Sequence, residues 1–216
     1  MSMNARPLLC ALFLAAGCVS GTDARSFDNH VLRSQADPAL TLQIDPAFDE
    51  LTPLRFPIGN QTDAERRIYV DAGSDGVIAR MIVVQFERAQ ESSDFRFVFR
   101  PSPPRRFGDN IYRFGAFVFD DAAAATQAPD REAGRTRVFL QSRGFRPPRF
   151  WRIARLARVS DAEGLTEVII FYQENADAHY PNGLAGVDED GDLPITGDEQ
   201  EALARRMEAA VRPIRG

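Results

Sequence analysis

One hairpin pattern constrains the fold more than any other feature of the chain. Residues 67–72 are typical of a strand, and Gly73-Ser74-Asp75-Gly76 supplies the residue types that turns with positive φ favour. Residues 77–87 then form the longest strand pattern, with apolar side chains on both faces of its middle. Such a strand must be covered on both sides. The pattern therefore predicts a hairpin whose second strand is central in a sheet.

Further segments of the chain have strand patterns of their own. Gly115 lies inside one of them, which indicates a bulge or the close approach of a large group such as a ring. Pro53 and Pro57 restrict the segment 51–58 to a sheet edge. A loop rich in Pro and Arg occupies 101–106. The remaining predicted strands cover 40–44, 95–100, 111–119, 151–159 and 165–172, and the last two form a second hairpin.

Two helices are predicted beside these strands. The first covers 130–143 and is followed by Gly144, a suitable C-cap. The second covers 196–211, where Leu203, Met207 and Val211 recur every four residues. Strands that are adjacent in sequence favour antiparallel pairing, so we expect an α+β fold: a mainly antiparallel sheet of about six to seven strands with two main helices packed against it.

The N-terminal segment has the pattern of an export signal. Arg6 supplies positive charge, and residues 8–16 form an apolar run too short to span a bilayer. It ends in Leu14-Ala15-Ala16-Gly17-Cys18, which resembles the lipobox of bacterial lipoproteins, with Ala15 where that family prefers leucine. The resemblance implies cleavage before Cys18, lipidation of Cys18, anchoring to a membrane, and a cell-envelope location facing the periplasm or exterior.

The same resemblance divides the chain into three parts. Residues 1–17 are expected to be the signal peptide, 18–39 the lipidated cysteine and a flexible tether, and 40–216 a single α+β domain. Cys10 leaves with the signal, so the mature chain cannot form an intrachain disulfide.

Charge is distributed unevenly. All 26 basic residues are arginine, and fourteen of them lie between residues 96 and 158, whereas the segment from residue 161 onward is acidic. Without lysine, neither a lysine Schiff base nor the usual phosphate loop is available. The net charge of −5 argues against nucleic acid as a partner. The basic centre either contacts an anionic partner or alternates on solvent-facing strand positions.

Aromatic residues form the clearest candidate binding site. Most of the 16 Phe, four Tyr and one Trp fall on predicted strands. They form either a phenylalanine-rich core or an aromatic-lined pocket for a hydrophobic or anionic small ligand in a curved sheet. The pocket interpretation places Phe97, Phe117, Trp151 and Phe171 in the lining, and Arg105 and Arg149 at the rim.

An acidic segment before the second helix resembles an EF-hand calcium loop. The candidate calcium ligands are Asp188, Asp190, Asp192 and Glu199, but Leu193 stands where the sharp turn of such a loop requires glycine. Alternatively, Thr196 and Glu199 form a capping box that starts the helix, and the acids are solvated. Beyond possible calcium, no cofactor is implied.

Enzymatic motifs are scarce in the sequence. No nucleophile elbow and no dinucleotide fingerprint occur, and His179 is one of only two histidines. The sequence thus favours a non-enzymatic envelope lipoprotein that serves as an interaction or structural module and acts through contacts with an envelope protein or another envelope component. The alternative is a periplasmic carrier or sensor with a hydrophobic ligand. An enzyme would require His179 and the acids at 188–192 to converge in one cleft.

Overall fold

The predicted central hairpin is formed by β6 (Thr62–Ala72) and β7 (Ile78–Ala89) in the computed structural model, which describes residues 24–98, 102–188 and 191–214. β7 lies between β6 and β11 and is covered on both faces, as expected for its two apolar sides. The α+β class and the antiparallel pairing are confirmed. Cys18 lies outside the described residues.

Two sheets form the domain. The larger has nine strands in the order β12-β9-β10-β11-β7-β6-β4, with β5 beside β6 and β8 beside β9, and the smaller has the order β1-β2-β3-β13. The other strands are β1 (Arg25–Asp28), β2 (Val31–Ser34), β3 (Leu40–Ile44), β4 (Asp49–Glu50), β5 (Leu54–Ile58), β8 (Pro104–Phe107), β9 (Asn110–Asp120), β10 (Phe150–Val159), β11 (Thr166–Asn175), β12 (Leu193–Pro194) and β13 (Val211–Pro213).

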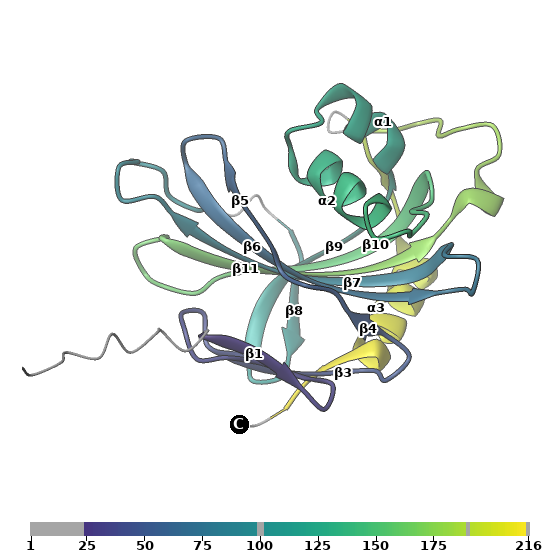
Figure 1. Ribbon diagram of the computed structural model, residues 1–216. Helices are drawn as coiled ribbons and strands as arrows, with labels where there is room; N and C mark the ends of the chain where they lie inside the picture. Colours follow the sequence, from purple (N-terminus) through teal and green to yellow (C-terminus); the bar gives the residue numbers. More distant parts are fainter. Residues whose placement is uncertain (1–23, 99–101, 189–190, 215–216) are drawn as a thin grey trace, which may run out of the picture.

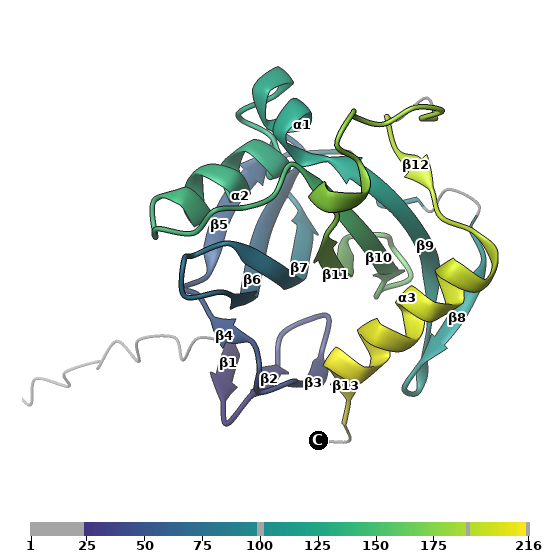
Figure 2. The ribbon, with the colours of Figure 1, turned by 90° about the vertical axis from the view of Figure 1, so that its right-hand side faces the viewer.

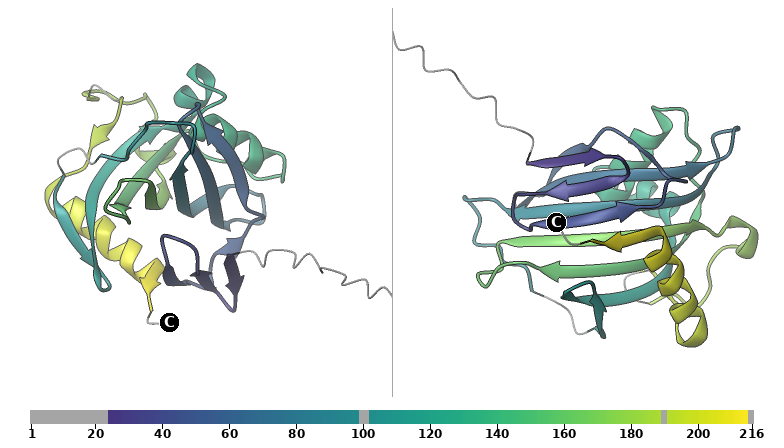
Figure 3. Two further views of the ribbon diagram at one scale, coloured as in Figure 1. Left: turned by 90° about the vertical axis from the view of Figure 1, so that its left-hand side faces the viewer. Right: turned by 90° about the horizontal axis from the view of Figure 1, so that it is seen from below.

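The larger sheet is strongly curved. Figure 2 shows it bending from β5 and β6 through β7, β11 and β10 to β9, with the smaller sheet across its concave side (Figures 1 and 3). Helix α3 (Gly197–Ala210) fills the space between β13 and β9. Helices α1 (Asp121–Gln127) and α2 (Glu132–Gln141) cover the convex side.

The concave side of the large sheet holds the main core. Its side chains come from both sheets and from the buried stripe of α3, for example Ile82, Leu156, Leu42 and Met207, each at most 1% exposed. These side chains fill the middle of the curve. The sequence also allowed an aromatic-lined pocket inside the curve. None of the four residues expected to line it belongs to this core: Phe97, Phe117, Trp151 and Phe171.

A second, smaller core lies on the convex side. Ile68, Val83, Trp151 and Ile153 project from the sheet, and Leu140 of α2 packs against them. Trp151 is only 1% exposed. Strand alternation explains the division, because Ala154 and Leu156 of β10 face the concave side while Ile153 and Arg155 face the convex side.

Two local expectations are corrected. Residues 25–34, expected in the tether, form the β1–β2 hairpin, and β2 pairs with β3 because Leu32 enters the concave core and Val31 is buried beside it in the sequence. Residues 95–98, expected to be a strand, are a loop: the Phe97 backbone N–H donates to the Gly164 carbonyl, and the Phe95 and Phe97 rings stack edge to face.

Candidate ligand-binding cleft

A cleft of about 510 Å³ lies between the convex face of the large sheet and the two helices α1 and α2. Its floor is apolar: Phe117 and Phe119 of β9 and Phe171 of β11, together with Met81 and Ile153. Strand alternation places Phe117 and Phe119 on the same face, and the antiparallel β9–β10–β11 pairing puts Phe171 on that face as well, with β10 between them.

The roof of the cleft explains why space remains above this floor. Helix α1 begins after Asp120, whose carboxylate accepts a hydrogen bond from the Ala123 N–H, and contains four consecutive alanines. Ala124 and Ala128 face the cleft, so methyl groups stand where larger side chains would fill it. Half-buried phenylalanine rings are thereby left partly uncovered.

Helix α2 is held over the sheet by the buried side chain of Arg66 on β6. Its guanidinium donates to the Thr136 hydroxyl (2.5 Å), to the Glu132 carbonyl oxygen (3.2 Å) and to the Gln85 side-chain oxygen. Burial lowers the pKa of Arg66 to about 10, so it stays charged at neutral pH. Arg66 therefore links the sheet to one wall of the cleft.

A smaller cleft of about 360 Å³ lies on the same convex face, next to the loop formed by residues 95–98. Phe95, Phe97, Ala157 and Glu167 line it, and Arg155 lines both clefts. Gly115 lies opposite Arg155 in the β9–β10 register and has no side chain to separate the two spaces. The pairing shows no register shift at Gly115, so the predicted bulge is absent and the glycine leaves room instead.

Replacing Gly115 or Gly134 with alanine should change the stability of the fold in opposite directions. A Cβ on Gly115 would meet no atom within 4 Å, so Gly115→Ala is expected to raise the free energy of unfolding by about 0.5–1 kcal/mol, the usual penalty of glycine in a strand. A Cβ on Gly134 of α2 would overlap the Pro129 backbone, so Gly134→Ala is expected to lower it by about 1–3 kcal/mol. Urea unfolding of both variants tests this; destabilisation by Gly115→Ala would contradict the open space.

Two buried carboxyl groups lie side by side at the far end of this face. Glu87 of β7 and Glu167 of β11 are register partners and are each 8% exposed. Burial raises the pKa of Glu167 to about 7, with a further increase from Glu87 and an opposing effect from Arg155. Burial also raises the pKa of Glu87, which accepts hydrogen bonds from Thr62 and Gln85.

No family model, curated protein or solved structure matches this chain.

The structure brings some of the predicted lining residues together and separates others. Phe117 and Phe171 share the large cleft, and Phe97 lines the adjoining one. Trp151 belongs to the convex core rather than to a cleft surface, because it is buried in one cluster with Leu140 of α2 and with its register partner Phe119. The prediction that Trp151 lines a pocket is corrected accordingly.

The two predicted rim arginines lie elsewhere. Arg105 of β8 pairs with Glu208 (2.8 Å) and Glu201 (3.1 Å) of α3. Arg149 pairs with Asp120 (2.8 Å) and stacks on the Phe150 ring. Neither lines the two clefts. Sequence reasoning assigned the arginines of the loops and missed Arg155, whose only signal was a charge among the apolar residues of one strand face.

Among the described residues, the acidic segment before α3 does not form a metal site. Among them, no group of three or more His, Cys, Asp and Glu side chains could hold an ion. Asp190 is outside the described residues, Asp188 accepts from the Asp192 N–H, and Glu199 pairs with Arg152 (2.9 Å). The predicted capping box is also not formed, because no side chain caps α3.

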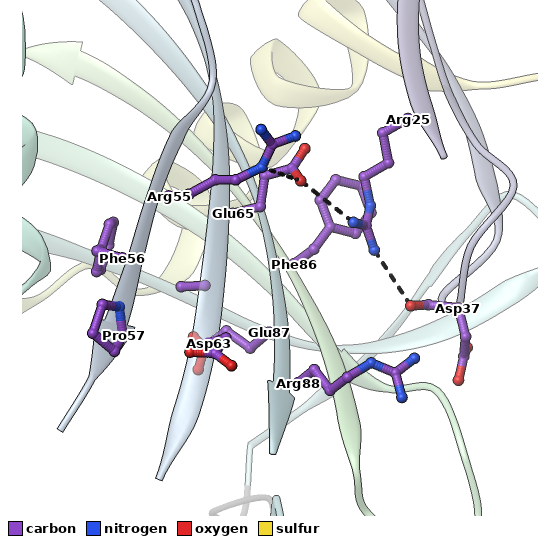
Figure 4. A pocket seen from close by; sticks show the side chains of 11 residues that line it. Arg25, Asp37, Arg55, Phe56, Pro57, Asp63, Glu65, Phe86, Glu87 and Arg88 are labelled. Atoms are coloured by element: carbon purple, nitrogen blue, oxygen red, sulfur yellow. Dashed lines mark hydrogen bonds and ion pairs between the residues drawn. The ribbon is translucent and has the colours of Figure 1, made fainter. Parts of the chain in front are cut away.

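A third cavity, of about 480 Å³, is shown in Figure 4. Here Arg25 and Arg55 both pair with Glu65 (3.5 and 3.1 Å), and Arg25 donates to the Asp37 carbonyl and stacks on Phe86. These charges satisfy one another and connect β1 to the edge of the large sheet. We therefore assign this cavity a structural role.

His179, the candidate residue for an enzymatic site, lies apart from both clefts. It is exposed in a short 3-10 turn (Asp177–His179) and does not line either cleft. Across the described residues, no helix has both the length and the apolar character needed to cross a membrane.

Proposed function

We propose that the protein is an envelope lipoprotein, held at a membrane by lipid on Cys18, whose domain binds a hydrophobic small ligand in the cleft beneath α1 and α2. It would act as a carrier or sensor. The anchor rests on the lipobox resemblance of residues 14–18. Two or more acyl chains would make that anchor durable, at about 0.8 kcal/mol per buried methylene.

The observation that carries the proposal is the uncovered aromatic floor. Phe117, Phe119 and Phe171 are half-buried in a cleft whose roof presents small side chains at Ala124 and Ala128. Covering such rings with an apolar ligand is favourable, at roughly 25 cal/mol per Å² of apolar surface removed from water. The volume of about 510 Å³ lies within the range of small-molecule sites.

The lining favours binding over catalysis. The residues that line the large cleft include no serine, cysteine or histidine. Its hydroxyl group, on Thr136, is bonded to Arg66, and Asp121 is paired with Arg137 (2.6 Å). No nucleophile is placed beside a general base there, which is the arrangement that nucleophilic catalysis requires.

A neutral fluorescent probe tests this proposal. The chain from Val19 onward, which contains every described residue, is expected to bind N-phenyl-1-naphthylamine with increased fluorescence. Ala124→Trp should weaken this binding at least about tenfold, because an indole on the cleft side of α1 occupies the space above the floor.

The matched control places the same indole on the same helix but outside the cleft. Thr126 of α1 is exposed and does not line it, so Thr126→Trp should bind the probe like the wild type. Circular dichroism checks that both variants fold. If the folded wild type leaves the probe fluorescence unchanged, or if both tryptophan variants bind it equally well, the proposal fails.

A further inference from the structure

Arg155 occupies the middle of the convex face, where the two clefts meet. Its register partners are Gly115 on β9 and Phe171 on β11. Because a Cβ on Gly115 would meet nothing within 4 Å, the space beside the Arg155 side chain is open. Phe171 is a register partner of Arg155, and Phe117 lies two residues after Gly115 on the same face of β9. The phenylalanine floor of the large cleft therefore begins directly beside Arg155.

The Arg155 guanidinium is half-buried, yet it makes no hydrogen bond or ion pair with any described residue. This distinguishes it from Arg66, which also lines the cleft but donates three hydrogen bonds within the protein. A guanidinium offers five N–H donors in a planar fork that matches a carboxylate or a phosphate. Arg155 therefore presents unused donors beside an apolar surface.

The acids near Arg155 oppose an anion only weakly. Asp121, on the cleft wall, is paired with Arg137. Glu167 and Glu87 lie on the side of the smaller cleft, and burial raises the pKa of both carboxyl groups, to about 7 for Glu167. Part of the negative charge of Glu167 is thereby removed near neutral pH. Glu132 and Asp192 also line the large cleft, and the exposed Arg131 stands beside Glu132.

We propose that the ligand of the cleft is a small anionic amphiphile, bound with its carboxylate or phosphate head on Arg155 and its apolar part on Phe117, Phe119 and Phe171. This inference rests on the proposed function, and it adds the chemical class of the ligand and the residue that selects it. A charge-assisted hydrogen bond to the half-buried guanidinium of Arg155 is the physical source of selectivity for the head group.

Displacement of N-phenyl-1-naphthylamine by decanoate, decyl phosphate, decanol and decyltrimethylammonium tests the inference. The four ligands share one alkyl chain and differ in their heads. The wild type is expected to bind at least one of the two anions about tenfold or more tightly than decanol, and to bind the cation worst. The better of the two anions identifies the head group.

Arg155→Met should remove this preference. Decanoate, decyl phosphate and decanol are then expected to bind within about threefold of one another, with affinity for the neutral probe retained. Arg155→Lys should keep most of the preference for the anions. Arg143→Met is the matched control, since Arg143 is exposed and stacks on Phe139 outside both clefts, and it should behave like the wild type.

The outcomes separate the two proposals. If the neutral probe binds but the wild type does not favour either anion over decanol, the anionic class is wrong and the apolar cleft stands. If Arg155→Met leaves the preference unchanged, Arg155 is not the head-group residue. If the folded protein binds neither the probe nor any of the four ligands, the proposed function fails and this inference fails with it.

Discussion

Replacing Arg66 with methionine is expected to lower the free energy of unfolding by about 3 kcal/mol. The side chain is 8% exposed and bonds to Gln85, Thr136 and the Glu132 carbonyl, so its loss leaves three buried polar groups without this donor. Methionine keeps most of the volume, and the loss therefore reports the hydrogen bonds rather than a cavity. Urea unfolding at pH 7 measures it.

Arg143→Met provides the comparison for this experiment. Arg143 is an exposed arginine that stacks on Phe139, and its replacement should change stability by less than about 0.5 kcal/mol. Native-state hydrogen exchange adds a local measurement, since amides of α2 should lose protection in Arg66→Met more than those of β10. A loss of less than about 1 kcal/mol would show that the Arg66 network contributes little.

The second large effect is a dependence of stability on pH that passes through Glu167. Its pKa rises from 4.5 to about 7 on folding, chiefly through burial. Between these values the folded state holds a proton that the unfolded state releases, so the stabilisation is fully present below pH 4.5 and is lost as the pH rises through about 7. The total is on the order of 3 kcal/mol.

Glu167→Gln keeps the side chain neutral at every pH and should remove this loss. Relative to the wild type, the variant is expected to gain on the order of 3 kcal/mol in free energy of unfolding between pH 5 and pH 8. The groups facing Glu167 are Glu87 on β7 and Arg155 on β10, and both remain in the variant. Taking the difference between variant and wild type cancels the titration of other carboxyl groups, including Asp161, whose pKa is lowered to about 2.

A surface acid of the adjoining turn controls for the change of charge alone. Glu163 is exposed, and Glu163→Gln should follow the wild-type pH curve. A difference between Glu167→Gln and the wild type that stays constant from pH 5 to pH 8 would contradict a neutral Glu167 in the folded state.

Much of the architecture follows from the strand patterns. Both predicted hairpins form, and the helix ending before Gly144 is present, with φ of +82° at that glycine. Alternation also assigns Phe117 and Phe171 to one face. These features depend on residues close in sequence, for which a period of two or a turn residue is sufficient information.

The remaining features depend on partners that are distant in sequence. Residues 31 and 32 form part of a strand because β3 pairs with them and both are buried, residue 32 in the concave core. Phe95 and Phe97 alternate like strand residues, but no neighbouring strand pairs with them among the described residues. The role of Arg155 likewise follows from the missing side chain of Gly115 on another strand, which a reading of β10 alone does not reveal.

The pairing of β3 with β13 has a consequence for the order in which the protein can be completed. Ile44 is joined to Val211, and Leu42 to Pro213, so this edge of the small sheet needs residues that are synthesised after every other described element. Closing so long a loop is slow compared with forming the central hairpins. A chain exported as we propose would therefore thread through a translocation channel while its concave core is still open. Completion of the fold is in this way delayed until the whole domain has crossed.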